Sequence, residues 1–312
     1  MLVTMAHLAV KAAAAALIGA GAAAAVWSLP RAAVDAKPTA SAVRVAAPGG
    51  STAATAEPVA APAENWKLVW QEEFNGHTLD PKWWNIEKTT PTNPGMGDND
   101  YTPEHVSVGD GMLTIKATKK EDGRYLTGLV ETRYKGFWKY GRFEARMKVP
   151  PGPGTNSSFW MMPNVKHFEK WPKSGEIDIA EQLGREPTMS HGTIHYPGEL
   201  LHRDHGVYNK DETLTEKLSD GFHVYAVEWR NGSFEWFIDG KSFHKTAQPD
   251  MAKFPFNRPF FMILCLGVGG KWEGYPTAET PMPIVMQVDW VRVYQMDPKA
   301  SKSATTDETK AG

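Results

Sequence analysis

The sequence predicts an all-β fold, a sandwich of two packed antiparallel sheets. Short segments alternate apolar and polar residues with a period of two, and Gly, Pro, Asn or Asp separates one segment from the next. No long stretch repeats apolar residues at helical spacing. Many short strands in one domain are typical of β-sandwiches and barrels. Two large sheets packed face to face leave one concave outer face, which we expect to hold a cleft.

The expected strands follow from this alternation. The segment FFMILCLGV (260–268) is apolar on both faces, which indicates a central strand buried on both sides. The other segments alternate strictly, and they are 112–118, 140–149, 175–181, 223–230, 233–240 and 286–295.

The two ends of the chain differ from this pattern. Residues 1–27 contain Lys11 and then an uncharged run of about 16 residues, which predicts a signal peptide or an uncleaved anchor, because a span of the bilayer needs ~20 residues. Residues 28–64 have the Ala- and Pro-rich composition of a disordered linker, and the polar 297–312 that of a disordered tail. We therefore expect a secreted protein, extracellular or periplasmic, with one folded domain over 65–296.

Composition excludes several functions. The 34 Lys and Arg residues balance 36 Asp and Glu residues, so no basic excess favours a nucleic-acid partner. Cys265 is the single cysteine, which excludes an intrachain disulfide and a zinc site built on several thiolates. The chain contains no G-x-S-x-G, H-E-x-x-H or phosphate-binding glycine loop. Its 12 Trp, 9 Tyr and 13 Phe residues favour a groove for a flat ligand such as a sugar. We also expect the protein to be a monomer.

The sharpest chemical feature is Glu176, Asp178 and Glu181 in SGEIDIAEQ. On a strand, Glu176 and Asp178 share a face, whereas Glu181 has the wrong parity and would point into the core. Burial of an unpaired carboxylate costs several kcal/mol. One extra residue within 179–180, a β-bulge, would return Glu181 to the acidic face.

Three acids in a row suit glycoside hydrolysis with retention, in which two carboxyl groups act as nucleophile and acid/base. We assign Glu176 as nucleophile, Glu181 as acid/base and Asp178 as the group that orients Glu176 and tunes its proton affinity. The spacing by itself fits a solvated strand face equally well. The apolar opposite face of the strand and the nearby Trp residues favour the catalytic interpretation.

Several motifs, in order, resemble family-16 glycoside hydrolases, and within them the laminarinase branch of endo-β-1,3-glucanases. The resemblance covers Trp66 to Gln295, and it implies a jelly-roll (concanavalin A-like) sandwich with the cleft on the concave face and the same three roles for the acids. The motifs are WQEEFNG (70–76), YGRFEARMKVP (140–150), SFWMMP (158–163), GEIDIAE (175–181), HGTIHYPG (191–198), FHVYAVEW (222–229), FFMILCLGVGGKWEGYP (260–276) and VDWVRVYQ (288–295).

Five further residues are candidates for binding substrate. Trp171 and Trp160 are placed to stack on sugar rings, although either could belong to the core. Trp272 is a third aromatic candidate. The resemblance places His195 beside the catalytic strand, and a zinc pair with His191 is a weak alternative because no third ligand is spaced for it. Asn99 could reach a sugar hydroxyl or serve as a plain turn residue.

The resemblance, rather than any loop motif, implies a structural calcium. Its expected ligands are Glu73, Gly111 and Asp289, with backbone oxygens contributing, because hard cations prefer oxygen. No cofactor is expected for catalysis.

The expected activity is endo-hydrolysis of β-1,3-glucan or mixed-linkage β-glucan, with β-glucan as the partner. Residues 155–158 (TNSS) stand where the laminarinase pattern has a Trp-Pro pair, so one aromatic wall is missing. An agarase or carrageenase is an alternative, because Lys166, Lys170 and Lys173 could favour a charged galactan. The same acids would also serve a transglycosylase, and the same sandwich would also suit a non-catalytic glucan-binding module.

Overall fold

A computed structural model describes residues 65–88, 99–163, 171–196, 203–209, 216–247 and 255–296. The predictions for 1–27, 28–64 and 297–312 lie outside these residues. Among the residues described, no helix has the length and apolar character needed to cross a membrane.

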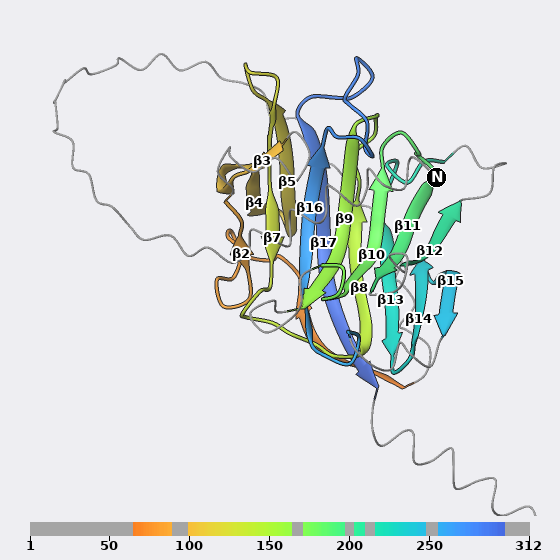
Figure 1. The fold of residues 1–312 in the computed structure, drawn as a ribbon. Helices are drawn as coiled ribbons and strands as arrows, with labels where there is room; N and C mark the ends of the chain where they lie inside the picture. Colours follow the sequence, from red (N-terminus) through yellow and green to blue (C-terminus); the bar gives the residue numbers. More distant parts are fainter. Residues whose placement is uncertain are drawn as a thin grey trace, which may run out of the picture.

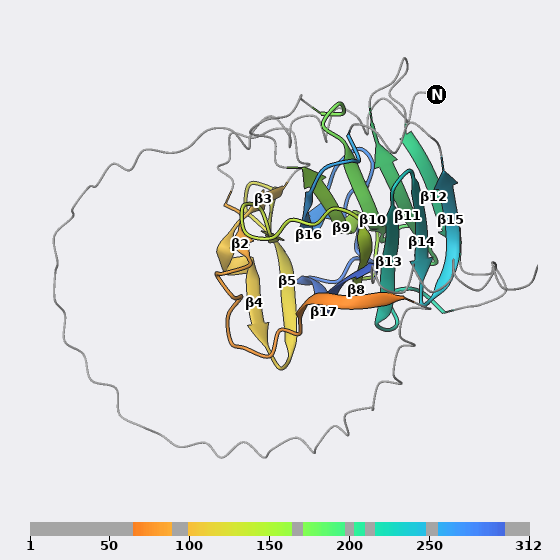
Figure 2. The same ribbon diagram turned by 90° about the horizontal axis from the view of Figure 1, so that it is seen from below.

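The fold is a sandwich of two sheets, as the alternation predicts, and Figures 1 and 2 show the sheets as stacked layers. In the described part of the chain, the first sheet has seven strands. Their order across the sheet is β12 (Arg203–Asn209), β11 (Met189–His195), β10 (Glu176–Leu183), β9 (Thr155–Pro163), β16 (Phe260–Val268), β7 (Leu129–Glu131) and β2 (Asn85–Ile86).

The second sheet has ten strands among the same residues. Its path is β15 (Lys241–Ala247), β14 (Ser233–Ile238), β13 (His223–Arg230), β8 (Gly141–Lys148), β17 (Ile284–Met296), β5 (Met112–Lys119), β6 (Tyr125–Thr127) and β3 (Asn99–Tyr101). Off this path, β1 (Trp66–Glu72) pairs with β17, and β4 (Val106–Gly109) pairs with β5. A 3-10 turn, η1 (Pro103–His105), precedes β4.

The main core lies between the two sheets, and the long central strands supply it with alternate residues. On β16, Phe260, Met262 and Leu264 belong to this core, whereas Phe261 and Cys265 pack in a second cluster on the outer face of the seven-stranded sheet. The prediction of a strand buried on both sides is therefore confirmed. Cys265 is a free, buried thiol in that outer cluster.

Candidate active site

The central feature of the site is a bulge in β10. Along β9, Asp178 pairs with Trp160 and Ala180 pairs with the next residue, Phe159, so Ile179 is the extra residue. The register with β11 shifts over the same stretch, between Asp178 and Glu181. The bulge expected from the cost of burying Glu181 is confirmed, and it gives Glu181 the same face as the two acids before it.

Residues of both sheets support the bulge. Ile179 and Ala180 are both in the main core, as two consecutive inward residues require. The indole nitrogen of Trp236, on β14 of the opposite sheet, donates a 2.8 Å hydrogen bond to the backbone oxygen of Asp178. Gly192 on β11 leaves room for this indole, since a Cβ there would lie 2.5 Å from the Trp236 ring.

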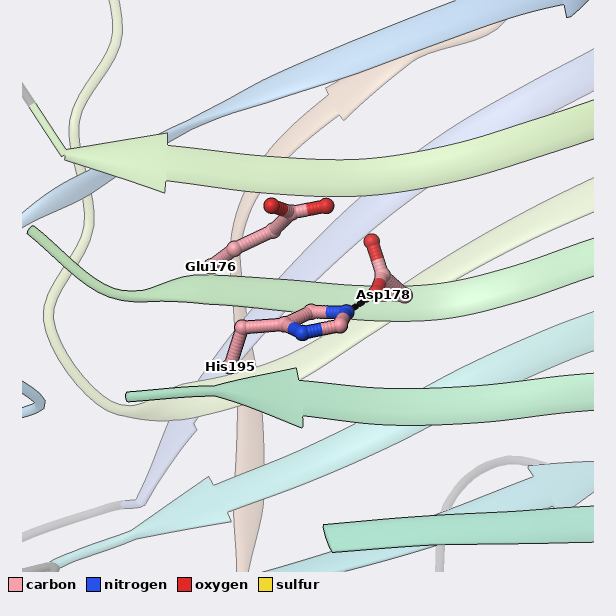
Figure 3. Close-up of side chains that lie close together, drawn as sticks. All are labelled: Glu176, Asp178 and His195. Carbon is pink, nitrogen blue, oxygen red and sulfur yellow. Dashed lines mark ion pairs between the residues drawn. The ribbon is translucent and has the colours of Figure 1, made fainter. Parts of the chain in front are cut away.

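The three acids lie on the outer face of the seven-stranded sheet and are almost completely buried. Glu176, Asp178 and Glu181 are 1%, 0% and 3% exposed. Figure 3 shows Glu176 and Asp178 on the same side of β10, with His195 reaching across from β11. His195 Nε2 lies 3.2 Å from Asp178 Oδ2. Burial of adjacent carboxylates is costly, so polar neighbours are needed to hold them.

Two of the predicted substrate residues contact the acids directly. The indole nitrogen of Trp171 donates a 2.5 Å hydrogen bond to Glu176 Oε2, and its ring centroid lies 5.7 Å from that of His195. His195 stands opposite Glu176 in the strand register. Trp171 is therefore a hydrogen-bond donor to the expected nucleophile, a contact that its sequence position did not reveal.

The other aromatic candidates, Trp160 and Trp272, lie at or near positions that stand opposite the acids on neighbouring strands. Trp160 is half-buried on the outer face, opposite Asp178 in the register. Trp272 is half-buried with its ring centroid 5.6 Å from that of His191, which itself stands opposite Glu181. The structure thus brings both tryptophans close to the acidic row.

Asn99 lies on β3 in the ten-stranded sheet, not on the seven-stranded sheet that carries the acids. It is 3% exposed on β3, and its side-chain oxygen accepts a 3.0 Å hydrogen bond from the backbone nitrogen of Val268 at the end of β16. This contact assigns it a structural role, and contact with a sugar stays a prediction.

The two histidines of the zinc alternative have different carboxylate neighbours. His191 Nε2 lies 2.6 Å from Glu186 Oε2, whereas His195 contacts Asp178. Each imidazole serves a separate polar pair, which does not favour a shared metal.

The expected calcium ligands fit a carboxylate-built site poorly. Glu73 makes two hydrogen bonds with Arg292, of 2.9 and 3.0 Å, and Asp289 accepts one of 2.6 Å from Arg146. Gly111 lies in the tight turn between β4 and β5, at a φ of 73°. Because arginines already neutralise both side chains, backbone oxygens would have to supply most ligands, and calcium stays a prediction.

Sequence reasoning missed a second polar group on the outer face. Glu131 on β7 stands opposite Ile263 of the outer cluster, is 3% exposed, and accepts a 2.5 Å hydrogen bond from Arg133. The Arg133 guanidinium carbon lies 5.3 Å from the centroid of the Phe261 ring. Burial raises the pKa of Glu131 to about 7, although the charge of Arg133 opposes this. Period-two alternation within LVETR (129–133) puts Glu131 on the same face as Leu129, and this is the signal that could have found it.

A row of buried carboxylates on the outer face of a jelly-roll sandwich, held by an indole and an imidazole, is the site of a glycosidase. Residues 66–296 match the family model described as the GH16 domain of β-porphyranases A–D. The chain belongs to glycoside hydrolase family 16.

Individual relatives agree with this assignment. The chain is 37% identical to glucan endo-1,3-β-glucosidase A1 of Niallia circulans, over 73% of this chain and 38% of that protein. It is 34% identical to a β-glucanase of Rhodothermus marinus, over 75% of this chain and 86% of that protein. The catalytic domain of a Thermotoga petrophila laminarinase superposes with a TM-score of 0.67 at 34% identity, over 74% of this chain and 98% of that domain. The chain thus spans well under half of the first relative and most of the other two.

Proposed function

We propose that the protein is an endo-acting hydrolase of β-1,3-glucan or mixed-linkage β-glucan that works by double displacement. The observation that carries this proposal is the bulged β10, which gives Glu176, Asp178 and Glu181 a common face. The endo-glucanase names of the most similar relatives support the choice of substrate.

In the first step, Glu176 attacks the anomeric carbon while Glu181 protonates the departing glycosidic oxygen, which yields a covalent glycosyl-enzyme. In the second step, Glu181 removes a proton from water, and this water attacks the same carbon and releases Glu176. The overall reaction retains the anomeric configuration.

The neighbours of the acids have distinct tasks in this scheme. The indole of Trp171 stabilises the ionised form of Glu176 and fixes its direction of attack. The imidazole of His195 contacts the carboxylate of Asp178. This contact offsets the electrostatic repulsion between Asp178 and Glu176.

A galactan is the second candidate substrate. The family model that matches this chain is named for β-porphyranases, and the chain has TNSS (155–158) instead of the Trp-Pro pair of the laminarinase pattern. Of the lysines that favoured a charged polysaccharide, Lys173 is exposed, while Lys166 and Lys170 lie outside the described residues.

The test is release of reducing sugar by the full-length protein from laminarin, mixed-linkage glucan, agarose, carrageenan and porphyran. Glu176→Gln and Glu181→Gln are the test variants, and Glu121→Gln on the exposed β5–β6 turn is the matched control. Cleavage of a glucan that both test variants lose, with the β-anomer as first product by NMR, supports the proposal. Cleavage of a galactan alone would keep the mechanism and replace the substrate. Binding without cleavage in the wild type would favour a glucan-binding module.

Transfer to sugar acceptors is the outcome that would favour a transglycosylase. We also propose that the protein is secreted, which rests on the sequence of residues 1–27, and that it acts as a monomer. N-terminal sequencing of protein from culture fluid and size-exclusion chromatography with light scattering test these two points.

A further inference from the structure

Two polar side chains of β9 lie beside Glu181. In the strand register, Ser158 stands directly opposite Glu181, and Asn156 is two residues further along β9. The Asn156 Nδ2 donates a 3.4 Å hydrogen bond to Glu181 Oε1, and Ser158 Oγ donates a 3.1 Å hydrogen bond to Asn156 Oδ1. Because the hydroxyl occupies the oxygen end of the amide, the NH2 end is directed at the carboxylate.

This chain of hydroxyl, amide and carboxylate is buried. Asn156 and Ser158 are each 6% exposed and Glu181 is 3% exposed. In such surroundings a hydrogen bond to a charged group is electrostatically stronger than in water. Ser157, between the two donors, points to the opposite face of β9 and takes no part in the chain of hydrogen bonds.

We propose that Asn156, oriented by Ser158, is a positioning residue that aims Glu181 and lowers its affinity for a proton. This inference rests on the proposed function, in which Glu181 acts first as an acid and then as a base. A donor to the ionised carboxylate favours the second role, since the base must be ionised when water attacks. The two residues belong to the TNSS segment, where the sequence departs from the laminarinase pattern.

Other titratable groups lie around Glu181 and Asn156, on β10 itself and on neighbouring elements, whereas the neighbouring residues of β9 are uncharged. These groups are Glu176 and Asp178 of β10, His191 of β11 with its partner Glu186, and Glu273 of the loop after β16. An ideal Cβ on Gly267 would lie 3.7 Å from both Asn156 Cβ and Glu273 Oε1, so the Glu273 carboxylate lies near Asn156. Substitutions on β9 change none of these groups. A change in the titration of Glu181 in the Asn156 variants therefore reports on Asn156.

The first test is the pH dependence of kcat/KM of the full-length protein on the glucan that it cleaves. Loss of one hydrogen bond to a carboxylate should move the alkaline limb of Asn156→Ala upward by about one pH unit. Asn156→Asp keeps the shape, removes the donor and adds a negative charge, so its limb should move at least as far. Ser158→Ala should move it less, in the same direction, and the matched control Ser157→Ala should leave it unchanged.

Two results would overturn the proposal. One is a pH profile of Asn156→Asp identical to that of the wild type, because a purely structural role depends on the shape of the side chain and not on its donor. The other is a displacement of the alkaline limb in Ser157→Ala equal to that in Asn156→Ala. A second measurement does not need turnover. Carboxyl-carbon NMR titration of Glu181, assigned with Glu181→Gln, should show an upward displacement of its titration in both Asn156→Asp and Ser158→Ala, and the larger displacement in Asn156→Asp. If no polysaccharide is cleaved, the proposed function fails, and this titration still decides the role of Asn156; an unchanged titration refutes it.

Discussion

Glu131 should make the stability of the protein depend on pH in an unusual direction. It is 3% exposed, and burial raises its pKa from 4.5 to about 7 in spite of Arg133. A carboxyl group with a raised folded pKa binds more protons in the folded state than in the unfolded state between these values. Its contribution to stability is therefore complete below about pH 4.5 and is lost as the pH rises to about 7.

The size of the effect follows from this pKa difference of about 2.5 pH units. At 1.36 kcal/mol per unit, the free energy of unfolding attributable to Glu131 should fall by about 3 kcal/mol between about pH 4.5 and 8. Glu131→Gln cannot ionise, so its stability relative to the wild type should increase by that amount over the same range.

Urea unfolding followed by tryptophan fluorescence at half-unit pH steps measures this difference. Glu121→Gln on an exposed turn controls for the loss of any glutamate. Burial also raises the pKa of Glu87, whose neighbouring charge is Arg133, so Glu87→Gln is needed to subtract its contribution. If the wild type gained stability relative to Glu131→Gln as the pH rose, the ion pair with Arg133 would outweigh burial, and the reasoning would be refuted.

Three further predictions concern the site and its support. Trp236→Phe removes the donor to the backbone carbonyl of Asp178 at the bulge. The free energy of unfolding, measured by urea denaturation, should fall by about 1–3 kcal/mol. An unchanged stability would mean that the bulge does not need this hydrogen bond. Trp171→Phe removes the donor to Glu176 and should reduce kcat by about 10- to 100-fold with a smaller change in KM, measured in steady-state assays; a change in KM alone would indicate sugar stacking instead. If calcium binds near Asp289, EDTA should lower the thermal midpoint of the wild type, with recovery on adding calcium and a smaller response in Asp289→Asn; equal midpoints with and without EDTA would exclude a stabilising ion.

The sequence by itself determined the fold class, the acidic row and its bulge. Alternation of apolar and polar residues is a local property, so it predicts strands and their faces wherever it occurs. The bulge followed from one local argument, because a regular strand would bury Glu181 in the core. The same alternation would have placed Glu131 on the outer face, but its buried state depends on neighbouring strands.

Only the tertiary structure decided what holds the acids. Trp236 is 58 residues from Asp178 along the chain and reaches it from the opposite sheet, and Asn156 is 25 residues from Glu181 on a neighbouring strand. Such contacts depend on strand order and register, which single-strand periodicity does not contain. Trp171 was expected to stack on sugar, and its hydrogen bond to Glu176, five residues along the chain, depends on side-chain directions that the sequence does not contain.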